Sequence, residues 1–487
     1  MTDHTMTDKT KRNSRWTFAI VSAAVFMAML DNLVVMMALP SIQKSLGGSI
    51  ESLEWTVNAY TLAFAVFLLI GAALGDRFGR RRMFIGGLSL FTISSAAAAI
   101  APSLETLVVA RATQGLGAAV LLPLTLTLLS ESVTPERRGA AIGAWSGISG
   151  LGIALGPIVG GVVVQGISWH WIFWLNVPLG IVLVPLAIAK LQESYGPSRK
   201  LDLPGVALVG FGLLGLVHGI VRANALGWTD PVIVGSITAG VLLLIAFVIQ
   251  ELRTSDPMLP MRLFRSRSFS ATNAASFALN FGLFGSTFLI AQTFQVAQGY
   301  TPVEAGVRTL PWTMMPLLVA PLAGLAAQRI GPRPLIAGGL AMQSVALYWL
   351  SEVMTPTVGY GSLVLPFIVA GVGMSLVFAP AAYGVLASVR AHEEGQASGA
   401  LNAIREVGGV LGVAVLASVF AANGSYVAPQ SFIDGVNAAM PVGAAVLAAG
   451  AVIGLLIPSK RKLDAAHAAK GADVSAARAE AAAPSPA

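Results

Sequence analysis

Charged residues are scarce in this sequence. Only 11% of the 487 residues are Asp, Glu, Lys or Arg, whereas 55% are hydrophobic. A soluble chain carries roughly 25% charged residues, because its surface must face water. The scarcity of charge therefore excludes an ordinary soluble protein and indicates a surface that faces mostly lipid.

Cysteine is absent altogether. Its absence excludes disulfide bonds and thiolate metal sites, although it leaves the compartment open. The chain also lacks the GxxxxGK loop of many ATPases, the HExxH of zinc proteases and the GxSxG of serine hydrolases. Its 5 His residues are scattered rather than clustered. We therefore expect no enzymatic activity, no metal and no cofactor.

Long apolar segments recur along the whole chain, each close to the ~20 residues that cross a hydrocarbon core. The first contains Asp31, is too long for a signal peptide and lacks a cleavage site of small residues. We count fourteen such segments, at 16–38, 55–75, 83–101, 104–130, 139–164, 168–190, 203–223, 231–250, 270–294, 303–327, 334–353, 361–387, 396–421 and 437–457. The sequence thus predicts an all-α polytopic membrane protein with 14 transmembrane helices.

Lys and Arg gather in every second loop, as they do in loops that stay in the cytoplasm. The loops on the other side hold Lys44 and little else. The basic loops contain Arg77, Arg80, Arg81 and Arg82; Arg137 and Arg138; Lys190, Arg199 and Lys200; Arg253, Arg262, Arg265 and Arg267; Arg329 and Arg333; and Arg390. This spacing of the basic charge favours a cytoplasmic-membrane protein with both termini in the cytoplasm, and it does not favour binding to nucleic acid.

The chain contains a weak internal repeat whose offset corresponds to eight spans. Gly115, Val133, Gly139, Gly143, Gly152 and Gly156 recur 256 positions later as Gly371, Val389, Gly395, Gly399, Gly408 and Gly412. Two six-helix halves separated by two extra helices explain this offset, and parallel six-helix repeats are a known transporter plan. We therefore predict a cytoplasmic N-terminus at 1–15, bundles at 16–190 and 270–457, two extra helices at 203–250, and a disordered cytoplasmic tail at 458–487.

Two charged side chains lie inside predicted spans at matching depth. Asp31 and Arg111 are each about seven residues from the outer end of their span, or roughly 10 Å below the membrane boundary. A buried charge of this kind costs about 2.5–3.5 kcal/mol and needs a partner or a proton. The two could pair directly or through water. Each residue could instead have a purely structural role. Asp31 would then only join two helices, and Arg111 would bond to backbone carbonyls.

Two further motifs suggest moving parts. Between the second and third spans, Gly79 allows a tight turn, and Asp76 can pair with Arg80 or another base. The preference for basic residues in cytoplasmic loops would by itself explain Arg77 and Arg80, but it would not explain Asp76 and Gly79. In the fifth span, glycines at four-residue spacing share one face, which lets a neighbouring helix approach closely, and a proline bends the helix. These residues are Gly152, Gly156, Pro157 and Gly160. Tight packing without any role in coupling is the alternative.

The thirteenth span adds a second pair of charges, Arg405 and Glu406, which point about 100° apart on a helix. Structural pairing of Glu406 and a role in proton coupling both remain open. Apolar and amide side chains near the membrane midplane would suit a pocket for varied ligands. The candidates for substrate binding are Met27, Asn58, Tyr60, Gln114, Phe281, Gln292 and Met314.

Up to the tail, the chain resembles the fourteen-spanner drug–proton antiporters of the major facilitator superfamily. The motifs around Asp31, Asp76, Arg111 and Gly152 carry this resemblance, in the order and on the spans that the family has. The chain departs from the family pattern at some positions, which are Leu33 and Met36 in place of Thr and Asn, Ala72 in place of Gly, and Glu406 in place of Gln.

The resemblance implies alternating-access export of small organic molecules such as drugs, antibiotics and amphipathic or cationic compounds. Protons would drive the export, with Asp31, Arg111, Arg405 and Glu406 as coupling residues and the turn and glycine motifs as gating elements. The partners would be the substrate, protons and the lipid bilayer, and the chain would act as a monomer. A dedicated exporter of one metabolite or antibiotic, a symporter and a non-transporting receptor are the alternatives.

Overall fold

The computed structural model describes residues 2–48, 50–196, 202–255, 257, 259–386, 388–389 and 394–461. The predicted disordered tail lies outside these residues from position 462 onward. Arg199, Lys200 and Arg390 of the predicted basic loops also lie outside them, as do the side chains of Arg137 and Arg138.

The described residues form helices joined by short turns. These helices are α1 (Thr2–Leu46), α2 (Ile50–Phe78), α3 (Arg80–Ala99), α4 (Leu104–Ser132), α5 (Pro135–Gly166), α6 (Trp171–Trp174), α7 (Asn176–Lys190), α8 (Leu203–Leu226), α9 (Pro231–Arg253), the 3₁₀ helix η1 (Met261–Arg265), α10 (Arg267–Gln292), the π-helix η2 (Thr293–Ala297), α11 (Pro302–Arg308), α12 (Leu310–Thr313), α13 (Met315–Ile330), α14 (Pro332–Val353), α15 (Tyr360–Leu386), α16 (Glu394–Asn423) and α17 (Pro429–Gly454).

The all-α polytopic prediction is confirmed, because every predicted span falls on one helix or on consecutive helices. Among the described residues, 12 helices are long and apolar enough to cross a membrane, or 13 if the bent pair Ser52–Leu68 and Ile70–Phe78 is one span. The remaining predicted span, 334–353, corresponds to α14, whose sequence is less apolar. This helix packs against α15 and α17 within the bundle.

Two predicted spans are broken rather than continuous. The span 303–327 divides into α11, α12 and α13, and Pro311 and Pro316 stand at the starts of the second and third pieces. Proline lacks the backbone N–H that a continuous helix needs, and its ring clashes with the preceding turn. The span 168–190 likewise divides into α6 and α7. Breaks of this kind leave backbone groups free for contacts between helices.

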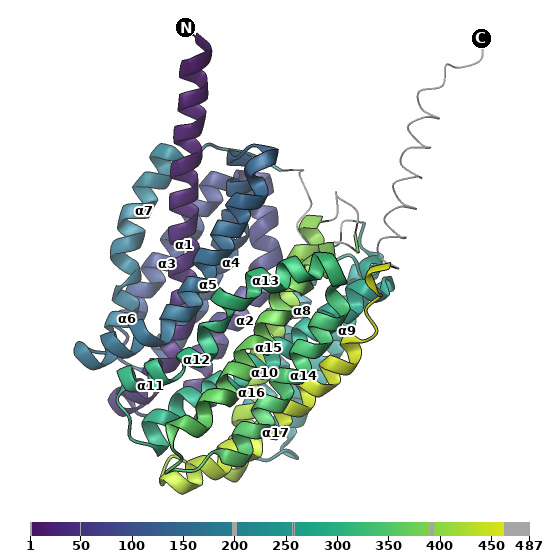
Figure 1. Cartoon of the computed structure of the whole chain (residues 1–487). Helices are drawn as coiled ribbons and strands as arrows, with labels where there is room; N and C mark the ends of the chain where they lie inside the picture. Colours follow the sequence, from purple (N-terminus) through teal and green to yellow (C-terminus); the bar gives the residue numbers. More distant parts are fainter. Residues whose placement is uncertain are drawn as a thin grey trace.

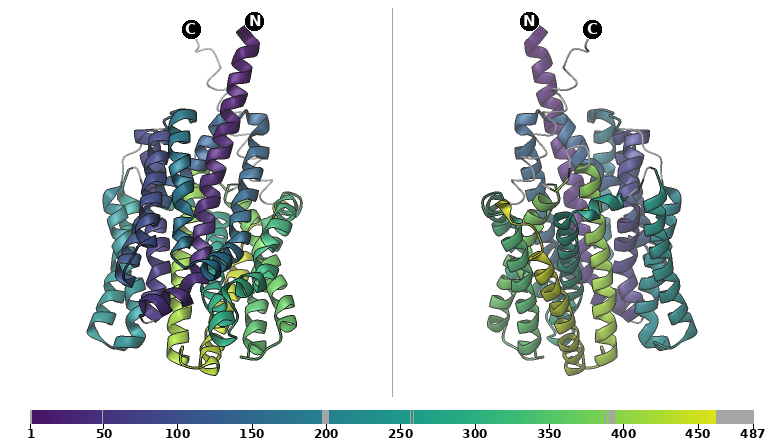
Figure 2. Two further views of the ribbon diagram at one scale, coloured as in Figure 1. Left: turned by 90° about the vertical axis from the view of Figure 1, so that its left-hand side faces the viewer. Right: turned by 90° about the vertical axis from the view of Figure 1, so that its right-hand side faces the viewer.

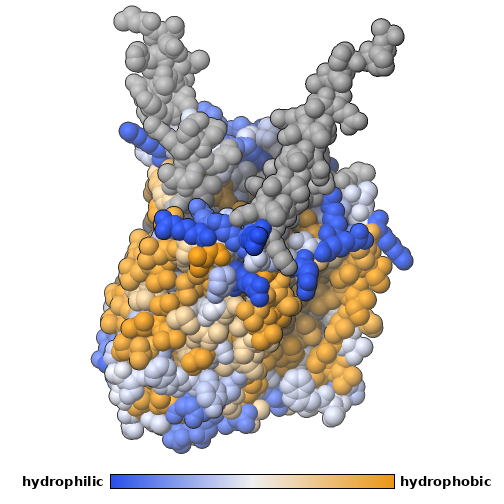
Figure 3. Space-filling view, turned by 45° about the vertical axis from the view of Figure 1, so that its right-hand side comes forward, coloured by the Kyte–Doolittle hydropathy of each residue, from blue (hydrophilic) through white to orange (hydrophobic). Residues whose placement is uncertain are grey.

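The helices form an elongated bundle in which the described chain begins and ends at the same end (Figures 1 and 2). We call this the terminal end, and the other the far end. α1, α3, α4, α5 and α7 pack around one another, α10 packs with α14, α16 and α17, and the α8–α9 pair lies against α2 and α16. The surface carries a broad apolar band between two more polar ends (Figure 3), as expected of a protein that spans a bilayer.

Candidate functional site

Asp31 on α1 and Arg111 on α4 form a buried ion pair. Arg111 Nη1 lies 2.6 Å from Asp31 Oδ2, and the two residues are 0% and 1% exposed. The matched depth of the two residues allowed a direct pair or a pair bridged by water, and the structure has the direct pair. Because the pair is taken out of water, loss of either charge would leave the other uncompensated, which typically costs 3–5 kcal/mol.

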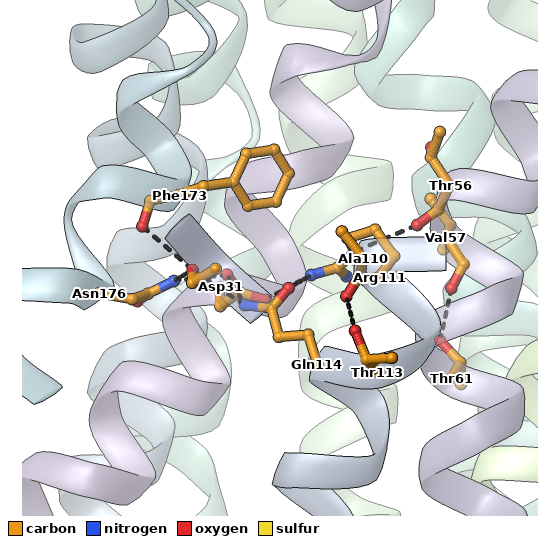
Figure 4. A network of polar contacts seen from close by, with 11 residues as sticks. Asp31, Thr56, Val57, Thr61, Ala110, Arg111, Thr113, Gln114, Phe173 and Asn176 are labelled. Atoms are coloured by element: carbon orange, nitrogen blue, oxygen red, sulfur yellow. Dashed lines mark hydrogen bonds and ion pairs between the residues drawn. The ribbon is translucent and has the colours of Figure 1, made fainter. Parts of the chain in front are cut away.

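Polar side chains from α3, α4 and α7 complete the surroundings of Asp31 (Figure 4). Asn176 Nδ2 donates to Asp31 Oδ1 at 2.7 Å, and Gln114 Nε2 donates to the same oxygen at 2.9 Å. Both amides also donate to the Ser95 hydroxyl, at 2.9 and 3.2 Å. The carboxylate therefore accepts hydrogen bonds from three donor side chains, which lie on α4 and α7.

Arg111 is held as firmly as its partner. Its Nε donates to the carbonyl of Thr56 on α2 at 3.2 Å, and its Nη1 donates to Gln114 Oε1 at 2.7 Å. The guanidinium carbon lies 4.2 Å from the centre of the Tyr60 ring, a cation–π contact. The alternative of bonding to backbone carbonyls thus occurs together with the ion pair, and α1, α2 and α4 meet at one charged centre.

Ser95 and Asn176 were not among the residues that the sequence singled out. Ser95 is one of several hydroxyl residues on α3, whereas Asn176 is the first residue of the mostly apolar α7. Asn176 begins α7 directly after the short α6, so the break between these helices aims its amide at Asp31. A polar residue beside a break in an apolar span is the one signal that could have indicated it.

Replacing Asn176 by Ala should destabilise the protein by about 1–3 kcal/mol, because Asp31 Oδ1 loses one of its two amide donors. The check is the apparent melting temperature of the purified protein in detergent. Asn423→Ala, at an exposed position on α16, is the matched control and should melt like the unaltered protein. Equal melting temperatures for the two variants would contradict a role of Asn176 in holding the carboxylate.

Arg405 and Glu406 lie side by side on α16 without bonding to each other. Arg405 Nη2 donates to the carbonyl of Phe378 at 3.1 Å, and its guanidinium lies over the Phe378 ring. Among the described side chains, Glu406 has no ion pair, and its Oε2 is buried without a hydrogen bond. Tyr60 is within electrostatic reach of both Asp31 and Glu406.

The turn motif forms a cluster of charges. Gly79 has a φ of 104°, which permits the turn between α2 and α3. Arg80 bonds Asp76 at 2.7 Å and also pairs with Glu131 of α4. Glu193, just after α7, accepts from the Arg81 backbone N–H at 2.9 Å. The cluster thus fastens helices of the first half to one another. The exposed Arg77 stacks on Phe78 instead.

Replacing Gly79 by Ala should destabilise the protein by about 1–3 kcal/mol, because a side chain is strained at this φ. The added Cβ would also lie 2.8 Å from the Glu193 carboxyl group. Gly86→Ala on α3 is the control, since a Cβ there meets nothing within 4 Å. The melting temperatures of the two variants decide the matter, and the prediction is wrong if Gly79→Ala melts like Gly86→Ala.

The glycine motif of α5 packs against the helix that carries Asp31. A Cβ on Gly156 would lie 2.7 Å from Leu33 Cβ, and one on Gly152 would lie 3.0 Å from Met29 Cβ. A Cβ on Gly160 would come within 3.1 Å of the Val34 backbone. The shared glycine face predicted from the spacing therefore exists, and it lets α5 approach α1 more closely than larger residues would.

The same helix contacts the second half of the chain at the far end. A Cβ on Gly161 would lie 2.4 Å from the carbonyl oxygen of Pro302 on α11. Reciprocally, a Cβ on Gly306 would lie 2.3 Å from the carbonyl oxygen of Pro157. Gln295 of η2 adds a hydrogen bond of 3.0 Å to the Met37 carbonyl of α1. α5 is thus packed between the Asp31 helix and the second half.

The seven predicted substrate residues are spread over α1, α2, α4, α10 and the break between α12 and α13. Met27 and Tyr60 share an apolar cluster in the first half, whereas Phe281 belongs to another. Gln292 accepts a hydrogen bond from the Tyr426 hydroxyl, both amide atoms of Asn58 are buried without a hydrogen bond, and Met314 lies between α12 and α13. A far-end cavity of about 470 Å³ is lined by none of the seven. Their role in substrate binding stays a prediction.

Comparison with known proteins places this arrangement in a family. Residues 21–413 match the Major Facilitator Superfamily. The tetracenomycin C resistance and export protein of Streptomyces glaucescens is 33% identical over 426 residues, covering 87% of this chain and 79% of that protein. The puromycin resistance protein of Streptomyces alboniger is 36% identical, with 86% of each chain covered.

Solved structures agree at the level of the fold. The crystal structure of a POT family transporter in complex with a thioalcohol-conjugated peptide has a TM-score of 0.68 at 16% identity, covering 93% of this chain and 96% of that one. With the family match over most of the chain and the apolar helices described above, the protein is a multi-pass membrane transporter that belongs to the major facilitator superfamily.

Proposed function

We propose that the protein is a proton-coupled antiporter that exports small organic molecules from the cytoplasm by alternating access. Two relatives are named for export of, or resistance to, an antibiotic, which supports outward transport of compounds of this kind. The observation that carries the proton coupling is the buried Asp31–Arg111 pair. A carboxyl group sealed from water and paired with one base changes its surroundings strongly when it takes up a proton.

Protonation of Asp31 would remove half of the ion pair and release Arg111 from it. Such a local change of charge can bias an element that has two stable arrangements. Here the element is the packing of α1 on α5, because the glycine face of α5 contacts α1 on both sides of Asp31. α5 in turn touches α11 through Gly161 and Gly306. This chain of contacts links the carboxyl group to the contact between the two halves at the far end.

The proposal includes the predicted organisation of the chain. The bundles 16–190 and 270–457 would rock about the substrate, helices at 203–250 would stand outside this movement, and the terminal end would face the cytoplasm. A monomer would suffice. Each proton that crosses 100 mV supplies about 2.3 kcal/mol, enough for a roughly fifty-fold gradient of a neutral substrate. Glu406, buried on α16, is a second candidate for proton transfer.

Export of a fluorescent dye from energised cells tests the proposal. Cells that produce the protein should lose the dye faster than control cells, and a protonophore should remove the difference. Faster accumulation of the dye would indicate symport instead. A rate that matches control cells for every compound tried, including antibiotics, would point to a receptor.

A dedicated exporter of one compound is the second candidate, because the two relatives are each named for a single antibiotic. Competition between chemically unrelated compounds for export distinguishes the two. A broad exporter shows mutual inhibition among them, whereas a dedicated exporter ignores all but one class.

A further inference from the structure

Two buried carboxyl groups face each other in the extra helix pair, away from Asp31 and Arg111. Asp202 precedes the first turn of α8, and Glu251 lies in the last turn of α9. The two residues are only 8% and 2% exposed. Since α8 and α9 form a hairpin closed by a short turn at residues 227–230, the two side chains lie at the same end of it.

One oxygen of each carboxyl group has a backbone donor. Asp202 Oδ1 accepts from the N–H of Gly205 at 2.9 Å and thereby caps α8. Glu251 Oε2 accepts from the N–H of Leu259 at 2.8 Å, which ties α9 to the segment that leads into α10. Both bonds hold the carboxyl groups in fixed orientations.

The remaining oxygens, Asp202 Oδ2 and Glu251 Oε1, are buried and accept no hydrogen bond. They point to the same place beside Gly205. A Cβ on Gly205 would lie 2.5 Å from Asp202 Oδ2 and 2.9 Å from Glu251 Oε1, and the two carboxyl groups are within hydrogen-bonding reach of each other. Two carboxylate oxygens are both acceptors, so this contact requires a hydrogen between them.

We infer that Asp202 and Glu251 bind one proton between them, forming a proton site separate from the Asp31–Arg111 centre. Two carboxylates that share a site cannot both ionise without strong repulsion. The elements at this end also carry Arg253 on α9 and Arg262 and Arg265 on η1. Among the charged groups, it is Asp202 that interacts electrostatically with Glu251.

The site joins three pieces of chain: the start of α8, the end of α9 and the segment before α10. Loss of the proton to water would leave two adjacent negative charges and push these pieces apart. Gly196, six residues before Asp202, donates its N–H to the Asp76 carbonyl, so the site lies at the same end as the Arg80 cluster. In the proposed orientation it therefore responds to cytoplasmic pH.

Glu251→Gln tests the site, because its amide can donate to Asp202 and still accept from Leu259. The full-length protein in detergent is melted from mildly acidic to mildly alkaline pH. The unaltered protein binds the proton when folded but loses it more readily when unfolded, so its stability is greatest at acidic pH and falls as pH rises. For one proton the ratio of folded to unfolded protein changes up to about tenfold per pH unit. The variant should lack this part of the slope.

Asp202→Asn is the second variant and should flatten the slope in the same way, since its amide can donate to Glu251 while its oxygen still caps α8. Glu352→Gln, at an exposed acid on α14, is the control and should keep the slope of the unaltered protein. Infrared difference spectra of the unaltered protein give a reading that needs no variant to fold. In the unaltered protein, the band of the protonated carboxyl group should disappear as pH rises. In Glu251→Gln and Asp202→Asn this band should be absent at every pH.

Equal slopes for Glu251→Gln and the unaltered protein would overturn the inference. So would a melting temperature that rises with sodium or potassium at fixed pH and loses this rise in Glu251→Gln, because the site would then bind a metal cation rather than a proton.

Discussion

Asp31→Asn should abolish proton-driven export while the protein still binds its substrate. Asparagine has nearly the same shape as aspartate and keeps an oxygen that can accept from Arg111, but it cannot gain or lose a proton. The substitution removes the negative charge of the ion pair in which Asp31 Oδ2 lies 2.6 Å from Arg111 Nη1. The switch between charged and neutral Asp31, which the proposal places at the centre of coupling, therefore disappears.

The measurement uses protein reconstituted into vesicles, with an imposed pH gradient and a labelled substrate. The variant should not accumulate substrate uphill, whereas equilibrium binding should remain within a few-fold of the unaltered protein. Asp434→Asn, at an exposed acid on α17, should transport normally. Uphill transport by Asp31→Asn would make Glu406 the leading candidate for proton coupling.

Gly156→Leu should impair coupled export far more than it impairs membrane insertion. Even the Cβ would lie 2.7 Å from Leu33 Cβ, so the larger side chain must force α5 away from α1. Overpacking of this kind costs about 1–3 kcal/mol. If one of the two transport states needs the close contact, this cost shifts the populations by roughly 5- to 150-fold.

Gly150→Leu on the same helix is the matched control, because a Cβ at Gly150 meets nothing within 4 Å. Export by this control should stay close to that of the unaltered protein at equal amounts in the membrane. Gly156→Leu should show normal amounts with strongly reduced export. A loss of inserted protein in parallel with the loss of export would show that Gly156 serves packing alone.

Properties that depend on one stretch of sequence could be predicted well. Span length and the clustering of Arg and Lys are local signals, so each predicted span falls on one helix or on consecutive helices, although only 12 or 13 spans of the described chain are long and apolar enough to cross a membrane. The pairing of Asp31 with Arg111 followed from depth alone, because depth is counted along each helix. The spacing of the glycines predicted a close approach of some helix to one face of α5, and the structure identifies that helix as α1.

Properties that depend on how helices are rotated against one another could not be predicted. Asn176 bonds both Asp31 and Ser95 only because α3 and α7 turn those faces inward. The sequence patterns did not single out Glu131 or Glu251, yet one pairs with Arg80 and the other is buried near Asp202. Polar residues at helix ends acquire such partners through the tertiary packing, which no pattern within a single helix records.

Substrate-dependent proton movement is the measurement that tests proton-coupled export most directly. Vesicles containing the unaltered protein and a trapped pH indicator are given a pH gradient, and a transported compound is then added. The account predicts that the compound speeds the collapse of the pH gradient and is itself moved against its own gradient. Transport of the compound with no accompanying proton movement, and at the same rate with and without the pH gradient, would contradict the account.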